Sequence, residues 1–138
     1  MNDPVDEGET RRVVERLYEA YLAGDAAGMR AEMAEDVEVR FLGQAELHGL
    51  DAFRRFQEFA GGLLTDLDFR IRKVIVDGEM GAAIWEETAR TADGRPWENH
   101  GVDVIRVRGG RIVSLHENND VTLVYRHFPR YVDPAPDA

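Results

Sequence analysis

The sequence predicts a single α+β domain, in which helices come first along the chain and an antiparallel sheet follows. Over residues 10–23 the apolar residues recur at spacings of four, which is typical of an amphipathic helix. From Asp66 onward they alternate with polar residues instead, and short glycine-containing turns separate the alternating segments. With 138 residues, 43% of them hydrophobic, the chain is long enough to bury a core within one domain.

Two helices are expected before the first strand. The first covers residues 10–23 and ends near Gly24, a residue type that favours the end of a helix. The carboxylate of Asp25 is placed to cap a second, short helix, on which Met29 and Met33 share one face. The chain is therefore expected to begin with two helices joined by a tight turn.

A strand and a third helix are expected next. Residues 36–42, DVEVRFL, alternate and indicate a strand, which residues 47–49, LHG, are expected to interrupt. Phe53 and Phe56 fall on one face of the following segment, and the glycine pair at 61–62 ends it. This spacing predicts the third of three N-terminal helices.

The remaining chain is predicted to form a long, bent antiparallel meander. The parity of the apolar positions changes after Ile71, so a β-bulge or bend is expected near Arg72 and Lys73. Further strands are expected at residues 80–91, 97–107 and 111–120.

The two ends of the chain are expected to be tails. Residues 1–9 are acidic and polar, which predicts a flexible N-terminal tail, and residues 129–138 form a proline-rich C-terminal tail. The domain itself is therefore predicted to span residues 10–128.

The hairpin within residues 98–120, ENHGVDVIRVRGGRIVSLHENND, carries acids in otherwise apolar strands. A three-residue loop at residues 108–110 pairs odd positions with odd positions and brings Asp103 near Glu117. A two-residue Gly-Gly turn pairs odd with even and brings Asp103 opposite His116 instead. The first register is favoured because it gathers apolar side chains of both strands on one face, namely Ile105, Val107, Val113 and Leu115.

Asp103 and Glu117 are candidate catalytic residues. Two carboxylates in a half-buried site cannot both ionise cheaply, so the pKa of one is expected to rise, and that group can donate a proton near neutral pH. Asn119, which both donates and accepts hydrogen bonds, is placed to orient a substrate oxygen or a water. The alternative is that residues 117–120 are only the solvated end of a strand, although the apolar neighbours of Asp103 argue against solvation at that position.

Charge and composition exclude several classes of partner. The formal net charge of -10 repels phosphate backbones and anionic lipid surfaces, so neither nucleic acid nor a membrane is expected as a partner. The chain has no cysteine, and its four histidines lack the HxxxH or HxH spacing of a metal site, so no metal is assigned. Because the N-terminus does not read as a secretory signal, a cytoplasmic location is expected.

Four segments together carry a resemblance to a known family, LYEAYLAGD (17–25), AEDVEV (34–39), ELHGLDAFRRF (46–56) and GVDVIRVRGGRIVSLHENND (101–120). In this order they resemble the nuclear-transport-factor-2-like (NTF2-like, cystatin-like) proteins. The resemblance is to the ketosteroid isomerase-like enzymes, limonene epoxide hydrolase and the SnoaL-like polyketide cyclases in particular. It implies a cone in which three N-terminal helices pack on a strongly curved antiparallel or mixed sheet. It also implies a homodimer formed through the outer face of the sheet.

The resemblance further implies where the chemistry lies. Such enzymes enclose one apolar pocket and act through acids on the inner face of the sheet, without a metal or an organic cofactor. Asp103 falls at the position of the protonated aspartate of ketosteroid isomerase, and Glu86 falls at an inward lining position. Phe41 stands near the position of the isomerase's base, so steroid isomerisation is not implied. Arg40 and Asp103, with a glutamate at 86 or 87, resemble the water-activating set of an epoxide hydrolase if their faces agree.

The function expected is that of a cofactor-independent acid/base enzyme, of isomerase, cyclase, dehydratase (lyase) or epoxide hydrolase type, acting on a small apolar metabolite. Asp103 is expected to act as acid or oxyanion donor, with Glu117 or Glu86 as its base. The alternative is a non-catalytic protein of the same fold that binds a small ligand or mediates assembly. The residues expected to contact the substrate are Asn119, Tyr18, Tyr21, Phe41, Phe56, Ile105, Leu115 and His116.

Overall fold

The computed structural model of the chain describes residues 5–128 and 130–135. Parts of both expected tails, residues 1–4, 129 and 136–138, lie outside the described residues. The α+β class is confirmed, because helices and strands follow one another as α1 (Glu7–Leu22), α2 (Ala26–Ala31), β1 (Met33–Phe41), β2 (Ala45–His48), α3 (Leu50–Ala60), β3 (Leu64–Asp77), β4 (Met80–Thr91), β5 (Pro96–Arg108), β6 (Arg111–Asn119) and α4 (Val121–His127).

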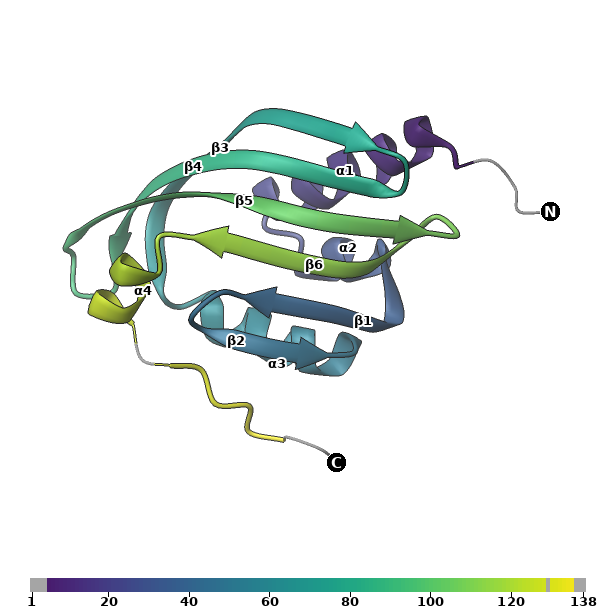
Figure 1. Cartoon of the computed structure of the whole chain (residues 1–138). Helices are drawn as coiled ribbons and strands as arrows, with labels where there is room; N and C mark the ends of the chain where they lie inside the picture. The colour runs from purple at the N-terminus through teal and green to yellow at the C-terminus, as the bar shows by residue number, and fades with distance from the viewer. Residues whose placement is uncertain (1–4, 129, 136–138) are drawn as a thin grey trace.

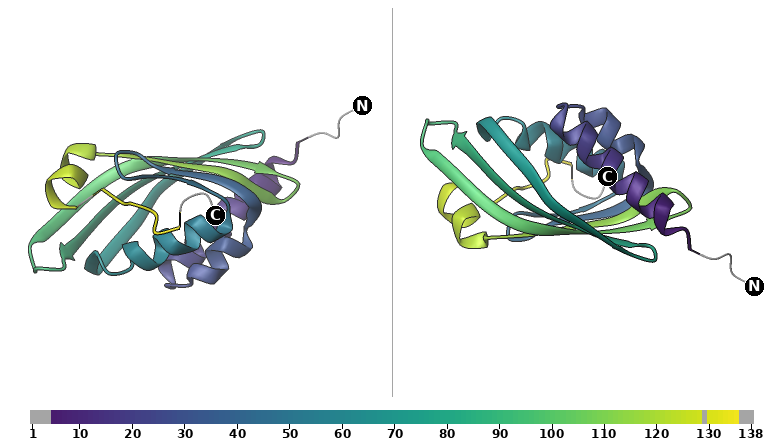
Figure 2. Two further views of the ribbon diagram at one scale, coloured as in Figure 1. Left: turned by 90° about the horizontal axis from the view of Figure 1, so that it is seen from below. Right: turned by 90° about the horizontal axis from the view of Figure 1, so that it is seen from above.

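The strands form one mixed sheet in the order β2-β1-β6-β5-β4-β3 (Figure 1). The pairing of β1 with β6 is parallel, and the other neighbouring strands are antiparallel. The sheet curves strongly, and the three N-terminal helices cover its concave face, whereas α4 lies at one end of the sheet (Figure 2). This is the cone predicted from the resemblance.

The helix α1 begins three residues earlier than the apolar spacing predicted. Asp6 caps it, since its side chain accepts a hydrogen bond from the backbone N–H of Glu9 at 3.1 Å. Acids in the first turn also suit the positive end of the helix dipole. Val13, Val14 and Leu17 are buried against the sheet, so the four-residue spacing marks the buried face correctly.

The second helix and the segment after β1 differ in part from the prediction. Asp25 caps α2 as expected, but Met33 is not on this helix, because α2 ends at Ala31 and Met33 begins β1. The segment predicted to interrupt the first strand pairs with it instead, and Leu47 of β2 lies opposite Val39. The alternation of apolar and polar residues did not predict β2, because a strand of four residues has too few positions to show this pattern.

The bend predicted in the long strand β3 is confirmed. The pairing of β3 with β4 shifts register between Ile71 and Lys73, and again between Thr65 and Asp68. Each irregularity adds local twist and lets the strand bend. The curved half of the sheet therefore wraps around the space beneath the helices.

The β5–β6 hairpin combines features of both predicted registers. Gly109 and Gly110 form a two-residue turn with φ values of 57° and 73°, and Arg108 pairs with Arg111. A register shift then follows, so that Val113 is an extra residue in β6 and odd positions pair with odd positions beyond it. Asp103 therefore lies opposite Glu117, as predicted, although Val113 does not share their face and the fully buried Ile112 takes the inward place.

The C-terminal part of the chain packs on the end of the cone. The helix α4 was not predicted; Asp120 caps it, and the buried Val124 packs against Trp97. Beyond it, the ring of Tyr131 lies 5.2 Å from that of Phe56, measured between ring centroids. Arg55 and Asp133 form an ion pair at 2.7 Å. The described part of the expected C-terminal tail is therefore attached to α3.

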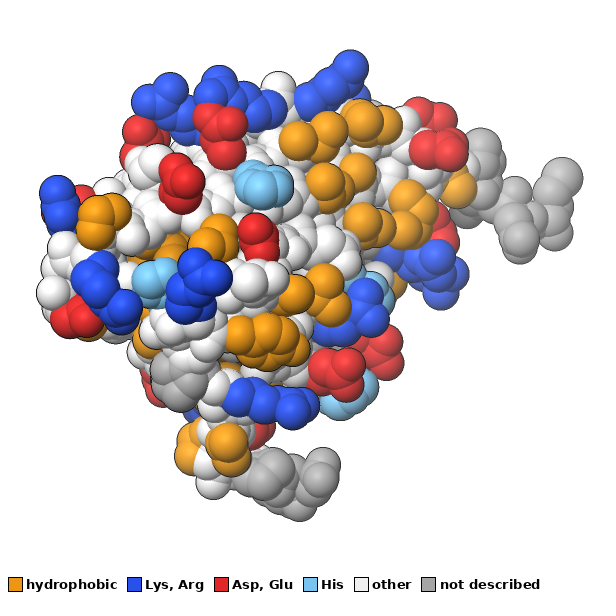
Figure 3. Space-filling model, turned by 60° about the vertical axis from the view of Figure 1, so that its left-hand side comes forward, with side chains coloured by type: hydrophobic (Ala, Val, Ile, Leu, Met, Phe, Trp, Pro, Cys, Tyr) orange, Lys and Arg blue, Asp and Glu red, His pale blue; other side chains and the backbone are white. Residues whose placement is uncertain are grey.

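The outer face of the sheet is rich in apolar side chains. Ile75 is 46% exposed, and Ile84, Val102 and Val104 lie partly buried on the neighbouring strands. Hydrophobic side chains gather there among charged ones (Figure 3).

Within the described part of the chain, no helix has the length and apolar character needed to cross a membrane.

Candidate active site

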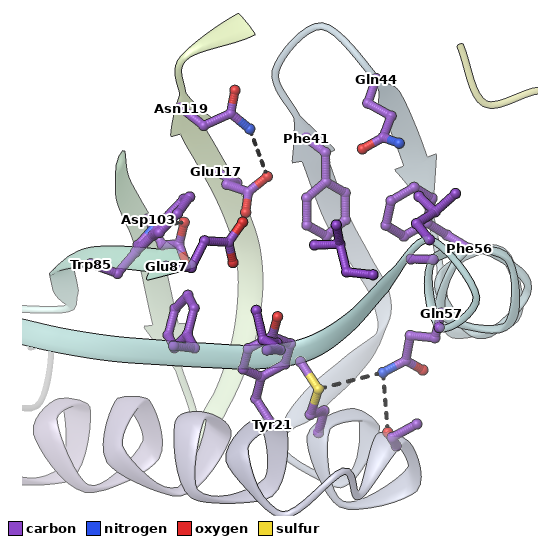
Figure 4. A pocket seen from close by; sticks show the side chains of 18 of the residues that line it. Tyr21, Phe41, Gln44, Phe56, Gln57, Trp85, Glu87, Asp103, Glu117 and Asn119 are labelled. Atoms are coloured by element: carbon purple, nitrogen blue, oxygen red, sulfur yellow. Dashed lines mark hydrogen bonds between the residues drawn. The ribbon is translucent and has the colours of Figure 1, made fainter. Parts of the chain in front are cut away.

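A pocket of about 370 Å³ lies between the helices and the concave face of the sheet. Its walls are mainly aromatic and aliphatic, and they include rings from α1, β1, α3, β3, β4 and β5. Figure 4 shows polar side chains reaching into this apolar space from the sheet. The pocket is therefore an apolar site with a small number of placed polar groups, the usual form of a small-molecule site.

Three carboxyl groups reach the pocket from the sheet, one from each of three neighbouring strands. Glu87 lies on β4, Asp103 on β5 and Glu117 on β6. Asp103 and Glu117 are direct partners in the β5–β6 pairing, and the three side chains point toward one another (Figure 4). The prediction that Asp103 lies near Glu117 is thus confirmed in geometry.

Asp103 is held by two donors in the pocket floor. The hydroxyl of Tyr18 donates to its Oδ2 at 2.5 Å, and the indole N–H of Trp85 donates to its Oδ1 at 2.9 Å. Only 7% of the residue is exposed. Burial raises the pKa of Asp103 to about 6, although the two hydrogen bonds favour the charged form and limit the rise. At neutral pH this carboxyl is therefore mainly ionised.

Glu117 has a different environment from its partner. The amide of Asn119 donates to its Oε2 at 3.1 Å. Burial raises the pKa of Glu117 well above its ordinary value, and the negative charges of Asp103 and Glu87 raise it further. Burial and the neighbouring charges thus favour the protonated form of Glu117, whereas the two donors favour the charged form of Asp103.

Glu87, not Glu86, is the glutamate that faces the pocket. The indole N–H of Trp97 donates to Oε1 of Glu87 at 3.0 Å, and burial raises the pKa of this carboxyl. Glu86 is exposed and pairs with Arg72, so the prediction of Glu86 as a catalytic residue is wrong in its geometry. Trp85 was the residue in the sequence that could have identified the inward glutamate. Residues two apart on a strand share a face, so a buried Trp85 places Glu87 on the inner face.

Most of the residues predicted to contact the substrate line the pocket, but two do not. Those that line it are Asn119, Tyr18, Tyr21, Phe41, Phe56 and Leu115. Ile105 shares their face, but it is fully buried in the core and does not reach the cavity. His116 pairs with Val104 and Arg40 on the opposite parity, so it faces away, and a His116–Asp103 dyad does not form. Because Arg40 shares this outward parity, it does not join Asp103 in a water-activating set.

Two buried amide atoms at the pocket have no hydrogen-bond partner among the described residues. They are Oδ1 of Asn119, an acceptor, and Nε2 of Gln44, a donor. Buried polar atoms are normally paired, so atoms of this kind at a cavity are candidates for ligand contacts. Gln44, in the turn between β1 and β2, carried no signal in the sequence because turn residues of this type are ordinarily solvated.

The ionisable side chains at the pocket other than tyrosines are all acidic. Its described lining residues include Asp25, Glu87, Asp103 and Glu117 but no Lys, Arg or His. The described residues also hold no group of three or more His, Cys, Asp or Glu side chains placed to bind a metal ion. The chemistry available from the side chains is therefore proton transfer and hydrogen bonding.

Comparison with known proteins places the fold. The SnoaL-like domain matches residues 14–115 of the chain. No curated protein matches the chain. Among solved structures, an NTF2-like protein of unknown function from Burkholderia pseudomallei K96243 has a TM-score of 0.80 at 22% identity, and the match covers 87% of this chain and 97% of that one.

Two further structures carry more specific descriptions. A candidate SnoaL-like polyketide cyclase from Jannaschia sp. CCS1 has a TM-score of 0.79 at 15% identity, covering 99% of each chain. TerC, co-crystallized with polyporic acid, has a TM-score of 0.77 at 14% identity, covering 86% of this chain and 97% of that one. At these identities the likeness shows the fold alone. The match over residues 14–115 shows the family, and the chain therefore belongs to the SnoaL-like domain family with an NTF2-like fold.

Proposed function

We propose that the chain is an enzyme that moves a proton on a small, largely apolar molecule, with Asp103 as base and Glu117 as acid. The observation that carries this proposal is the direct pairing of two carboxyl groups at an apolar pocket, in different environments. Two donors stabilise the carboxylate of Asp103, whereas burial and neighbouring charges raise the pKa of Glu117 well above its ordinary value. An acid and a base ready at the same pH are what isomerisation, cyclisation and dehydration require.

The different environments assign the roles. The carboxylate of Asp103 accepts hydrogen bonds from Tyr18 and Trp85, and both stabilise its charge. Burial favours the neutral form of Glu117, and the negative charge of Asp103 on the opposite strand favours it further. The sequence had suggested Asp103 as the acid, whereas these contacts support the reverse assignment.

The alternative, a non-catalytic protein that binds a ligand or mediates assembly, fits the contacts less well. A purely structural role for the acids would pair them with arginines in a filled cone. Instead the pocket is about 370 Å³, and its described lining residues include no Lys or Arg. The likeness to a candidate polyketide cyclase and to TerC with polyporic acid also supports a small molecule as the ligand.

A probe reaction tests the proposal without knowledge of the natural substrate. The aromatic compound 5-nitrobenzisoxazole loses a proton from carbon to a base and opens to a coloured phenolate, so a carboxylate in an apolar pocket accelerates it. We expect saturable elimination whose rate rises with pH through about 6, as Asp103 ionises. Asp103→Asn is expected to lower kcat/KM about 100-fold or more.

The matched control is Glu86→Gln, because Glu86 lies on the outer face beside the pocket residue Glu87. This variant is expected to retain the wild-type rate, and circular dichroism checks that both variants fold. Elimination by Asp103→Asn at the wild-type rate would exclude this carboxylate as the base.

A further inference from the structure

Glu87 is a pocket carboxylate that the proposed acid/base pair does not use. It lies on the inner face of β4, between Phe69 of β3 and Asn99 of β5 in the pairing of the sheet. Trp97 donates to its Oε1 at 3.0 Å. Its Oε2 accepts no hydrogen bond from another described residue, so this carboxylate can accept further bonds from a ligand.

Aromatic rings surround the approach to Glu87. The ring of Phe69, its neighbour on β3, packs edge-on against Tyr21 with centroids 4.9 Å apart, and stacks on Trp85 at 5.4 Å. These rings all line the pocket. Aromatic faces attract organic cations, and a carboxylate beside them adds a full opposite charge.

The hydrogen-bonding groups of the pocket have a surplus of acceptors, although Nε2 of Gln44 is a buried donor without a partner among the described residues. Glu87, Asp103 and Glu117 are carboxyl groups, and Oδ1 of the buried Asn119 is an acceptor without a partner among the described residues. The described lining residues include no Lys, Arg or His to balance these groups. A ligand that supplies donors and positive charge therefore fits this pocket, whereas a carboxylate or phosphate is repelled.

We infer that the substrate class is a ring-bearing molecule with a protonated amine, which binds between the carboxylate of Glu87 and the rings of Phe69 and Tyr21. The ammonium group supplies the missing donors and neutralises Glu87, while Asp103 and Glu117 stay free for proton transfer. Because the bound amine is taken to be the substrate, this inference rests on the proposed function.

Three probes of matched shape test the inference by calorimetry at neutral pH. They are 2-(aminomethyl)naphthalene, which is a cation, 2-(hydroxymethyl)naphthalene, which is neutral, and 2-naphthoate, which is an anion. We expect the amine to bind the wild-type protein about tenfold more tightly than the alcohol, or better, and the naphthoate to bind least. The amine is also expected to inhibit the benzisoxazole reaction competitively, because both occupy one pocket.

A pair of variants tests whether the ammonium group binds at Glu87. Glu87→Gln is expected to remove the preference for the amine over the alcohol while leaving the affinity for the alcohol unchanged. Glu86→Gln, the neighbouring change on the outer face, is expected to keep the full preference. The ranking of the three probes by the wild-type protein needs no variant, so it decides the matter even where Glu87→Gln does not fold.

The outcomes separate this inference from the proposed function. Equal binding of amine and alcohol, or binding of the naphthoate as tight as that of the amine, overturns the substrate class, even where elimination by Asp103 proceeds. Retention of the amine preference by a folded Glu87→Gln variant overturns the placement. Preferential amine binding that depends on Glu87, without any elimination, supports the inference and removes the acid/base function alone.

Discussion

Asp103 and Glu117 show how contacts distinguish two groups of nearly identical chemistry. Both are carboxyl groups on paired positions of neighbouring strands, and burial raises the pKa of both. Asp103 accepts bonds from Tyr18 and Trp85 that stabilise its charged form. For Glu117 the charge of Asp103 adds to the effect of burial, so its protonated form is favoured.

The raised pKa of Glu117 predicts a particular dependence of stability on pH. A carboxyl whose pKa is higher in the folded state favours folding fully below its unfolded pKa, and this contribution is lost as pH rises through its folded pKa. The free energy of unfolding of the wild-type protein is therefore expected to fall as pH rises above the unfolded pKa of a glutamate, about 4.3, and through the raised folded pKa. In Glu117→Gln this fall is expected to be smaller, because glutamine cannot ionise. Urea denaturation followed by tryptophan fluorescence at several pH values measures it.

The outward-facing Glu86 supplies the control for this measurement. Its pKa is lowered by the hydrogen bond from Arg72, and its side chain is largely exposed, so Glu86→Gln is not expected to flatten the profile. An unchanged slope in Glu117→Gln would show that Glu117 is ionised in the folded protein at neutral pH, which contradicts its role as the acid.

At the scale of elements, the β5–β6 hairpin decides which side chains meet in the pocket. A two-residue turn alone would place Asp103 out of register with Glu117, since it pairs odd positions with even. The extra residue Val113 shifts the pairing by one and returns Glu117 to the inner face. A β-bulge thus sets the position of a carboxyl several residues away from it.

Gly101 of β5 lies directly opposite Trp85 in the pairing of β4 with β5. A Cβ added at Gly101 would lie 2.7 Å from Cζ2 of Trp85 and would also meet the carbonyl oxygen of Asn118. Gly101→Ala is therefore expected to destabilise the protein by about 1–3 kcal/mol, as overpacking does in a filled core. It should also move the indole that donates to Asp103 and so alter tryptophan fluorescence.

Gly62→Ala is the matched change at an uncrowded site, because the nearest atom to its added Cβ is the carbonyl oxygen of Phe59 at 4.0 Å. It is expected to leave the midpoint of urea denaturation close to that of the wild type. Equal midpoints for Gly101→Ala and the wild type would mean that Trp85 has room to move.

At the scale of the whole molecule, the two faces of the sheet differ in the side chains that they carry. The concave face carries the carboxyl groups and packs against the helices, whereas the outer face carries the exposed Ile75 and the partly buried Ile84, Val102 and Val104. A partly exposed apolar patch of this kind on a small domain is typical of an interaction surface. The homodimer expected from the resemblance would bury it.

Dimerisation through this outer face stays a prediction with a direct test. Light scattering after size-exclusion chromatography is expected to give twice the chain mass for the wild type. The double variant Ile84→Glu/Val104→Glu places charges in the centre of the patch and is expected to give the mass of a single chain. A wild-type protein of single-chain mass, or a double variant that remains dimeric, would contradict the use of this face.

The sequence by itself determined the elements whose signals are local. The four-residue spacing in α1, the capping Asp25, the change of parity after Ile71 and the alternation in β4 to β6 each arise from neighbouring residues along one chain segment. For that reason the α+β class, the three N-terminal helices and the bend in β3 could be predicted. The acidic character of the hairpin also identified Asp103 and Glu117 as candidates.

Only the tertiary structure decided which of these groups share the pocket. Val113 carries no local sign of being a bulge, and Glu86 and Glu87 are equivalent residues until the packing of Trp85 turns one of them inward. The donors Tyr18 and Trp97 reach their carboxyl groups from other elements. Contacts between distant segments depend on register and packing, which are settled when the sheet curves and the helices close over it.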